Sequence, residues 1–161
     1  MSAVVLIDTS VYLNILNVPD NNQDYEQVDT DFTDMENDGD QFLLPLATIF
    51  ETGNHIADLD NGRQRRAFAQ LLVDDVCNSL TNNAPYTITQ IPPTPLFVKW
   101  LSEFPNYAMR NKQAKKAKEE GVSLSDFTII KEWDVQCAKN PPPRRVRIWS
   151  LDSDLSAYDR K

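Results

Sequence analysis

Acidic side chains in this chain of 161 residues stand at positions where a shared metal site could form: Asp8, Glu51, Asp126, Asp152 and Asp154. Three or four ionised carboxylates cannot occupy one small site unless a cation offsets their repulsion. Oxygen ligands without a cysteine cluster favour Mg²⁺ or Mn²⁺. One or two such ions activate water and stabilise the leaving oxygen in phosphodiester hydrolysis, so this is the chemistry that the residue types favour.

The elements that would position these acids can be predicted from the hydrophobic pattern. Short apolar runs predict strands at residues 3–7, 42–44, 86–91 and 146–149, and the segments between them favour helices. Strands that alternate with helices indicate a mainly parallel sheet covered on both faces. We therefore expect one α/β domain over residues 1–161, a three-layer α/β/α sandwich with a short central sheet.

The predicted topology gives the acids a common location. Asp8 follows the first strand, Glu51 lies one turn into the helix after the second strand, and Asp152 follows the last strand. Asp126 lies in the first turn of a late helix. In parallel sheets ligands bind beyond the carboxyl ends of the strands, so these acids can converge at one edge.

Each acid also has a purely structural interpretation. Asp8 could cap the helix that follows it, and Glu51 could be an ordinary polar residue on a partly buried helix. Asp126 completes a capping box with Ser123, because an acid three residues after the cap reaches back to it. Asp152 and Asp154 could be turn residues.

Charge is distributed unevenly along the chain. Residues 1–62 contain 13 acidic residues and no Lys or Arg, whereas residues 63–161 contain 11 acidic and 16 basic residues. Residues 20–41 alone carry nine acidic residues, and we expect this insertion to be a solvated loop or a helix with frayed ends rather than part of the core.

A net charge of −8 argues against loose electrostatic binding of nucleic acid, so an RNA ligand would need a local basic strip. One candidate strip immediately precedes the helix of Asp126 and another precedes the last strand. The candidate RNA-binding residues are Arg110, Lys112, Lys115, Lys116, Lys118, Arg144 and Arg145.

The four acidic segments together resemble the PIN-domain family, to which the ribonuclease toxins of VapC-type toxin–antitoxin pairs belong. The matching stretches are LIDTSVYLNIL with Asp8, LPLATIFETGNHIA with Glu51, GVSLSDFTIIKEW with Asp126 and RVRIWSLDSDL with Asp152. Their order, spacing and flanking elements follow the pattern of that family, over about a third of the chain.

The resemblance implies a PIN-like fold and a metal-dependent endoribonuclease that uses Mg²⁺ or Mn²⁺. By position, it makes Asp8, Glu51, Asp126 and Asp152 the catalytic metal ligands, with Asp154 as a further candidate ligand. Ser10 matches the small polar residue that supports the first aspartate. The implied partners are an RNA substrate and, for a toxin, an antitoxin, and homodimers are common among proteins of this kind.

Other function classes remain open from the sequence. A PIN-like scaffold or regulatory module could keep the acids while binding a protein partner through its acidic segment. A phosphotransfer protein of the receiver kind needs a second Asp two positions after the first, where this chain has Ser10. Because no apolar run approaches the roughly 20 residues that span a bilayer, we expect a cytoplasmic protein without a membrane partner.

Overall fold

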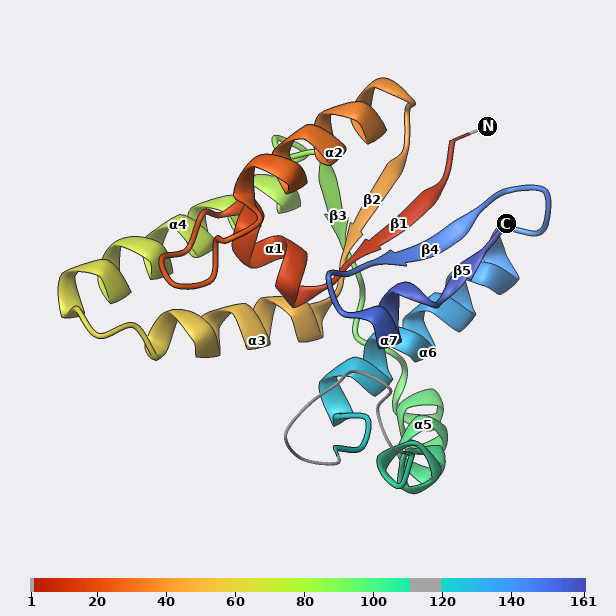
Figure 1. Ribbon diagram of the computed structural model, residues 1–161. Coiled ribbons are helices and arrows are strands. Elements are labelled where there is room, and N and C mark those ends of the chain that lie inside the picture. Colours follow the sequence, from red (N-terminus) through yellow and green to blue (C-terminus); the bar gives the residue numbers. More distant parts are fainter. Residues whose placement is uncertain (1, 111–119) are drawn as a thin grey trace.

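The computed structural model describes residues 2–110 and 120–161, in which strands and helices alternate along the chain (Figure 1). The strands are β1 (Val4–Ile7), β2 (Gln41–Leu44), β3 (Tyr86–Ile88), β4 (Val146–Trp149) and β5 (Asp159–Arg160). The helices are α1 (Thr9–Ile15), α2 (Tyr25–Asn37), α3 (Leu46–Ala57), α4 (Gly62–Leu80), α5 (Thr94–Ala108), α6 (Leu124–Lys139) and α7 (Ser153–Ser156).

The described strands form one sheet in the order β3-β2-β1-β4-β5. β1 pairs in parallel with both β2 and β4, so that Val4 lies between Gln41 and Val146, and β2 pairs in parallel with β3. Only β5 runs antiparallel, beside β4. The carboxyl ends of β1, β2, β3 and β4 therefore meet at one edge of the sheet, as the sequence predicts.

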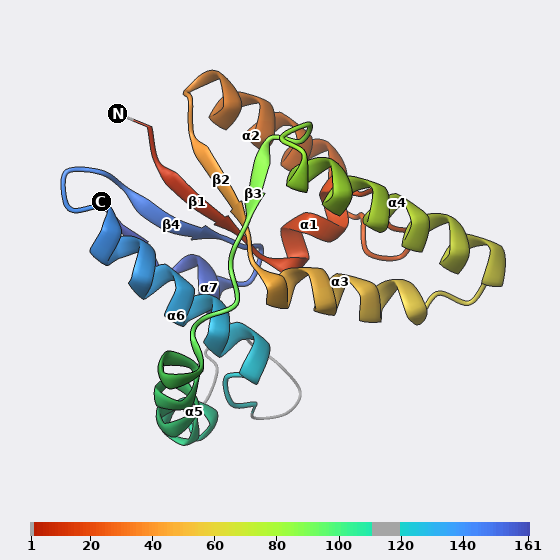
Figure 2. The same cartoon turned by 180° about the vertical axis from the view of Figure 1, so that it is seen from behind.

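Helices cover both faces of the sheet and give three layers, consistent with an α/β/α sandwich (Figures 1 and 2). Val5 and Ile7 belong to a core shared with α1, α2 and α4, whereas Val4 and Leu6 belong to a core shared with α6. All four residues of β1 are fully buried. This two-sided burial explains why the strand reads as an uninterrupted apolar run.

The acidic segment 20–41 is more ordered than a solvated insertion. It contains α2, which is one of the two expected forms, but the expectation that it lies outside the core is wrong. Val28 and Met35 are buried, and Phe32 stacks on Phe42 with ring centroids 4.6 Å apart. These apolar residues recur at helical spacing on one face, while the acidic residues occupy the solvent side.

Two short elements at the end of the chain were not predicted. α7 occupies positions expected to be turn residues, and β5 adds two residues to the edge of the sheet. Both are too short to give a periodic signal. None of the helices in the described part of the chain combines the length and apolarity needed to cross a membrane.

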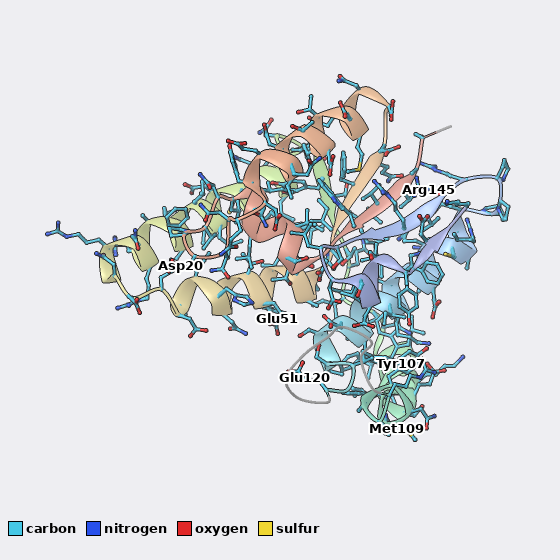
Figure 3. The ribbon with its side chains drawn as sticks, in the orientation of Figure 1. Asp20, Glu51, Tyr107, Met109, Glu120 and Arg145 are labelled. Atoms are coloured by element: carbon cyan, nitrogen blue, oxygen red, sulfur yellow. The ribbon has the colours of Figure 1, made fainter. Side chains whose placement is uncertain are left out.

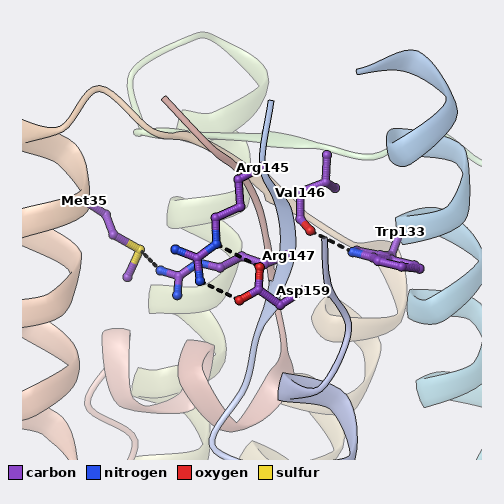
Figure 4. A network of polar contacts seen from close by, with 6 residues as sticks. All are labelled: Met35, Trp133, Arg145, Val146, Arg147 and Asp159. Atoms are coloured by element: carbon purple, nitrogen blue, oxygen red, sulfur yellow. Dashed lines mark hydrogen bonds and ion pairs between the residues drawn. The ribbon is translucent and has the colours of Figure 1, made fainter. Parts of the chain in front are cut away.

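Side chains fasten three neighbouring elements to β4 (Figure 4). Arg145 donates to both carboxylate oxygens of Asp159 in β5, at 2.8 and 2.5 Å. The guanidinium of Arg147 lies 2.7 Å from the sulfur of Met35 in α2. The indole nitrogen of Trp133 in α6 donates to the backbone oxygen of Val146 at 3.0 Å. The Arg145–Asp159 pair holds the two-residue strand β5 at the edge of the sheet, and the other two contacts join β4 to α2 and α6.

The carboxylate of Asp75 in α4 accepts hydrogen bonds from two tyrosines, one in α1 and one in β3, and so links these three elements. The hydroxyl of Tyr12 donates to Asp75 Oδ2 at 2.5 Å, and the hydroxyl of Tyr86 donates to the same oxygen. Burial, followed by the hydrogen bond to Asp75, raises the pKa of both tyrosines, so both remain protonated donors. Asp75 therefore satisfies two hydroxyls that the core would otherwise leave unpaired.

Replacing Asp75 by Leu should lower the free energy of unfolding by about 2–4 kcal/mol, because two buried hydroxyls lose their acceptor. Urea unfolding measures this loss. The matched control is the Tyr86→Phe variant. Adding Asp75→Leu to it should lower the free energy of unfolding by a smaller amount, since only the hydroxyl of Tyr12 then loses its acceptor. An equal cost in both backgrounds would contradict the shared role of Asp75.

Candidate functional site

Asp8 lies at the carboxyl end of β1, at the point where the sheet order reverses. The chain proceeds from β1 through β2 to β3 on one side and then returns to β4 on the other side. In open α/β sheets, ligands bind in the crevice outside such a reversal. The backbone nitrogen of Asp8 donates to the oxygen of Trp149 at 3.0 Å, which fixes the ends of β1 and β4 together.

The carboxylate of Asp8 is oriented by two serines from distant parts of the chain. Asp8 Oδ2 accepts from Ser10 Oγ at 2.9 Å and from Ser150 Oγ at 2.8 Å. Each serine is itself held by the loop after β4, since Leu151 N donates to Ser10 Oγ at 3.0 Å and Asp152 N donates to Ser150 Oγ at 2.9 Å. Ser10 thus contacts the first acid, and its supporting role in a metal site stays a prediction.

The carboxylate of Asp8 is buried without an ion-pair partner in the part of the chain that the structure describes. The residue is only 5% exposed, and among the described residues no Lys, Arg or His forms an ion pair with it. Although α1 begins at the next residue, the Asp8 side chain makes no capping hydrogen bond to that helix. A buried carboxylate is normally paired or bound to a metal. The helix-cap interpretation of Asp8 therefore does not account for its position.

Asp152 lies in the loop after β4 and Asp154 in α7, two and four residues beyond Ser150, which contacts Asp8, but Asp152 has a local role. Its Oδ1 accepts from the backbone nitrogen of Asp154 at 3.0 Å, and Asp152 is the N-cap residue of α7. The sequence suggested a turn residue at this position, and the structure makes Asp152 a helix cap instead. Capping uses one oxygen and leaves the second for another ligand.

Glu51 in α3 and Asp126 in α6 also lie at this edge of the sheet. Glu51 Oε1 accepts from Ser125 Oγ at 2.8 Å, which joins α3 to the first turn of α6. Asp126 is the next residue along α6, and its backbone nitrogen donates to Ser123 Oγ at 3.1 Å. The predicted N-cap at Ser123 is confirmed. The carboxylate of Asp126 also sits at a helix N-terminus, where negative charge is stabilised.

The acids thus gather in two places along one edge, around Ser150 and around Ser125. Among the described residues, no group of three or more His, Cys, Asp or Glu is arranged to hold a metal ion. The donor chemistry nevertheless fits a hard divalent cation, because Asp8 is buried, oriented by hydroxyls and, within residues 2–110 and 120–161, without an ion-pair partner. The structure therefore presents metal-ligand residue types at one edge, but not a closed coordination shell.

The predicted RNA-binding residues are spread over the molecule. Arg110 lies over the ring of Tyr107, 4.1 Å from its centroid, and Lys112, Lys115, Lys116 and Lys118 fall outside the described residues. Arg144 donates to Gln41 Oε1 at 3.2 Å, and Arg145 is paired with Asp159. Figure 3 shows Arg145 at the far end of the strands from Glu51. RNA binding by Arg144 and Arg145 stays a prediction, and it would take place away from the acids.

A further acid at this edge escaped the sequence prediction. Glu132 in α6 accepts from Thr89 Oγ1 at 2.7 Å through Oε1, whereas its Oε2 is buried and has no hydrogen-bond partner in the described part of the chain. Burial raises the pKa of Glu132 to about 7. No motif marks this residue, because its surroundings come from α5 and from the segment after β3.

The hydroxyl partners of the acids were also missed as site residues. Ser150 and Ser125 contact Asp8 and Glu51 across 142 and 74 positions of sequence, respectively. Ser150 carried a partial signal, since it stands two residues before Asp152 in a pattern that the family resemblance emphasises. Comparison of the chain with protein-family models and with curated proteins finds no match, so the functional argument rests on the residues themselves.

The raised pKa of Glu132 predicts a pH-dependent stability. Because the folded state keeps the proton up to about pH 7, whereas the unfolded chain releases it near the ordinary glutamate pKa of 4.5, stability falls as the pH rises between these values. Glu132→Gln keeps an acceptor for Thr89 and removes the titration. At pH 8 it should raise the free energy of unfolding by up to about 3 kcal/mol, and at pH 4 by little. Urea unfolding at the two pH values measures the difference, and an equal effect at both would contradict it.

Divalent-ion binding predicts a second stability effect. Ions that bind only the folded state should stabilise it by about 2.7 kcal/mol at 100 times their Kd, and thus raise Tm by several degrees. We expect this rise for the wild type with Mn²⁺ and its loss in Asp8→Asn. The matched control is Asp34→Asn on the exposed side of α2, which should respond like the wild type. Equal shifts in Asp8→Asn and the wild type would show that any bound ion lies elsewhere.

Proposed function

We propose that this protein is a PIN-like endoribonuclease that depends on Mg²⁺ or Mn²⁺ and hydrolyses RNA phosphodiester bonds. The observation that carries the proposal is the Asp8 carboxylate, which is buried at the reversal of the strand order and has no cation beside it among the described residues. A protein rarely maintains such a charge without a ligand that requires it.

In this proposal, Asp8, Glu51, Asp126 and Asp152 hold the ion, and Asp154 lies close enough in sequence to assist. The bound ion would supply an activated water and would offset the charge that develops on the phosphate. The chain's own contribution is orientation: Ser10 and Ser150 hold the Asp8 carboxylate, and Ser125 holds that of Glu51. Such partners of metal ligands commonly tune affinity and activity about 10–100-fold.

RNA is the favoured substrate because the acids lie along an open edge rather than in a closed cavity, and because the four acidic segments resemble the PIN family. Arg110 lies at the end of α5, on the part of the chain that leads to α6, and is the described candidate for a phosphate contact near this edge. The same resemblance supports a toxin of a toxin–antitoxin pair, with an antitoxin as the protein partner.

A second candidate function is a PIN-like scaffold or regulatory module without significant nuclease activity. Two observations favour it: Asp152 is engaged in capping α7, and no closed group of metal ligands occurs among the described residues. A scaffold of this kind would keep Asp8 and its serines for the stability of the edge. The two candidates differ in what happens to RNA.

Incubation with a mixed RNA pool separates them. The wild type should cleave RNA with Mn²⁺ or Mg²⁺ and should stop on addition of EDTA, since the ion is needed for the attack on phosphorus. Asp8→Asn should be inactive, Ser150→Ala should be about 10–100-fold slower, and Asp34→Asn should be unaffected. Gel electrophoresis of the RNA measures all four.

Cleavage that survives EDTA, or that proceeds equally in Asp8→Asn, would refute the metal-dependent nuclease. Intact RNA with every variant under every condition would favour the scaffold instead.

A further inference from the structure

An apolar cavity opens beside the acidic edge, between α3, α5 and α6. Its volume is about 460 Å³, and its walls include Phe50, Ile91, Phe97, Trp100, Ser125 and Glu132. A second cavity of about 410 Å³ adjoins it and shares Trp100 and Glu132. Figure 2 shows α5 below the sheet beside the start of α6, which is where these cavities form. The space is large enough for a flat ring of the size of a nucleobase.

The cavity is directly connected to the candidate acids. Phe50 precedes Glu51 in α3, and Ser125 precedes Asp126 in α6. Ser125 belongs to both places, because it lines the cavity and donates to Glu51 Oε1 at 2.8 Å. A nucleotide with its phosphate at the acids would therefore have its base within reach of the cavity.

Among the described residues that line the first cavity, Glu132 is the one that can carry a charge. Glu132 Oε1 accepts from Thr89, whereas Oε2 is buried and has no hydrogen-bond partner among the described residues. A buried acceptor without a donor costs free energy. Because Oε2 is shielded from solvent, a ligand in the cavity supplies that donor when the Glu132 side chain turns toward it. The aromatic rings of Phe50 and Phe97 are 69% and 39% exposed, which leaves apolar faces available for stacking.

We propose that this cavity binds a guanine base of the RNA, next to the phosphate that the acids engage. The proposal rests on the nuclease function proposed above and names its base preference. An ionised carboxylate only accepts hydrogen bonds, through two oxygens with about four lone-pair sites. Guanine presents two adjacent donors, N1–H and N2–H, on its Watson–Crick edge. Adenine, cytosine and uracil each present one donor there beside an acceptor, so they match the carboxylate less well.

Single-stranded RNA is commonly read in this way, by stacking an unpaired base on aromatic side chains and bonding its edge. The pH dependence follows from the same contact. Guanine favours the ionised carboxylate, and Glu132 has a pKa of about 7 because it is buried. Guanine binding should therefore become tighter as the pH rises from 6 to 8.

Calorimetric titration with nucleoside monophosphates tests the proposal without cleavage. In EDTA, the folded protein and its Asp8→Asn variant should both bind guanosine monophosphate. Inosine monophosphate lacks the N2 donor and should bind at least fivefold more weakly, and adenosine and uridine monophosphates weaker still. Glu132→Gln should lose at least tenfold in affinity for the guanine nucleotide, and Phe97→Ala should weaken all four. Glu36→Gln, on the exposed side of α2, is the matched control.

Equal affinity for the four nucleotides, no binding at millimolar concentration, or an unchanged Glu132→Gln variant would overturn the guanine site. So would a change of oligomeric state in Phe97→Ala by sedimentation, since it would show that the cavity is a protein contact. These outcomes are independent of the nuclease test. RNA cleavage without base preference would support the nuclease and contradict the guanine site. Guanine binding without cleavage would support the guanine site and contradict the nuclease.

Discussion

The pairing of β1 with both β2 and β4 is the constraint on which the rest of this structure depends. A strand buried on both faces must be apolar along its whole length, and β1 is fully buried from Val4 to Ile7. The first polar side chain after it, Asp8, is then placed at the end of the central strand, where it is buried and its backbone nitrogen still bonds to Trp149 of β4. Its carboxylate must find partners there, and the hydroxyls of Ser10 and Ser150 supply them.

Hydroxyl side chains recur at this edge of the sheet. Ser150 contacts Asp8, Ser125 contacts Glu51, and Thr48 donates to the backbone oxygen of Ile7 at 2.8 Å. A hydroxyl orients a carboxylate without neutralising its charge. Among the described residues, hydroxyls rather than basic side chains contact Asp8 and Glu51 at this edge.

Much of the fold could be predicted because its signals are local. The strand β1, the helix that follows it and the cap at Ser123 are each visible within a few residues, since periodicity and capping act over one or two turns. The burial of α2 was missed because nine acidic residues in that region mask three apolar ones on one face. The short elements α7 and β5 were missed because their stability comes from neighbours, as in the pairing of Arg145 with Asp159.

The same distinction between local signals and contacts from distant segments applies to the candidate site. By itself, the sequence determined that carboxylates follow the strands. An apolar run and the polar residue that ends it are neighbours in the chain, so both are visible without the tertiary structure. Only the tertiary structure decided which of them are buried, which hydroxyl each one accepts from, and that Asp152 also caps a helix. It alone placed Glu132 beside a cavity next to the acids. Burial and desolvation depend on what packs around a side chain, and those neighbours come from segments up to 142 residues away.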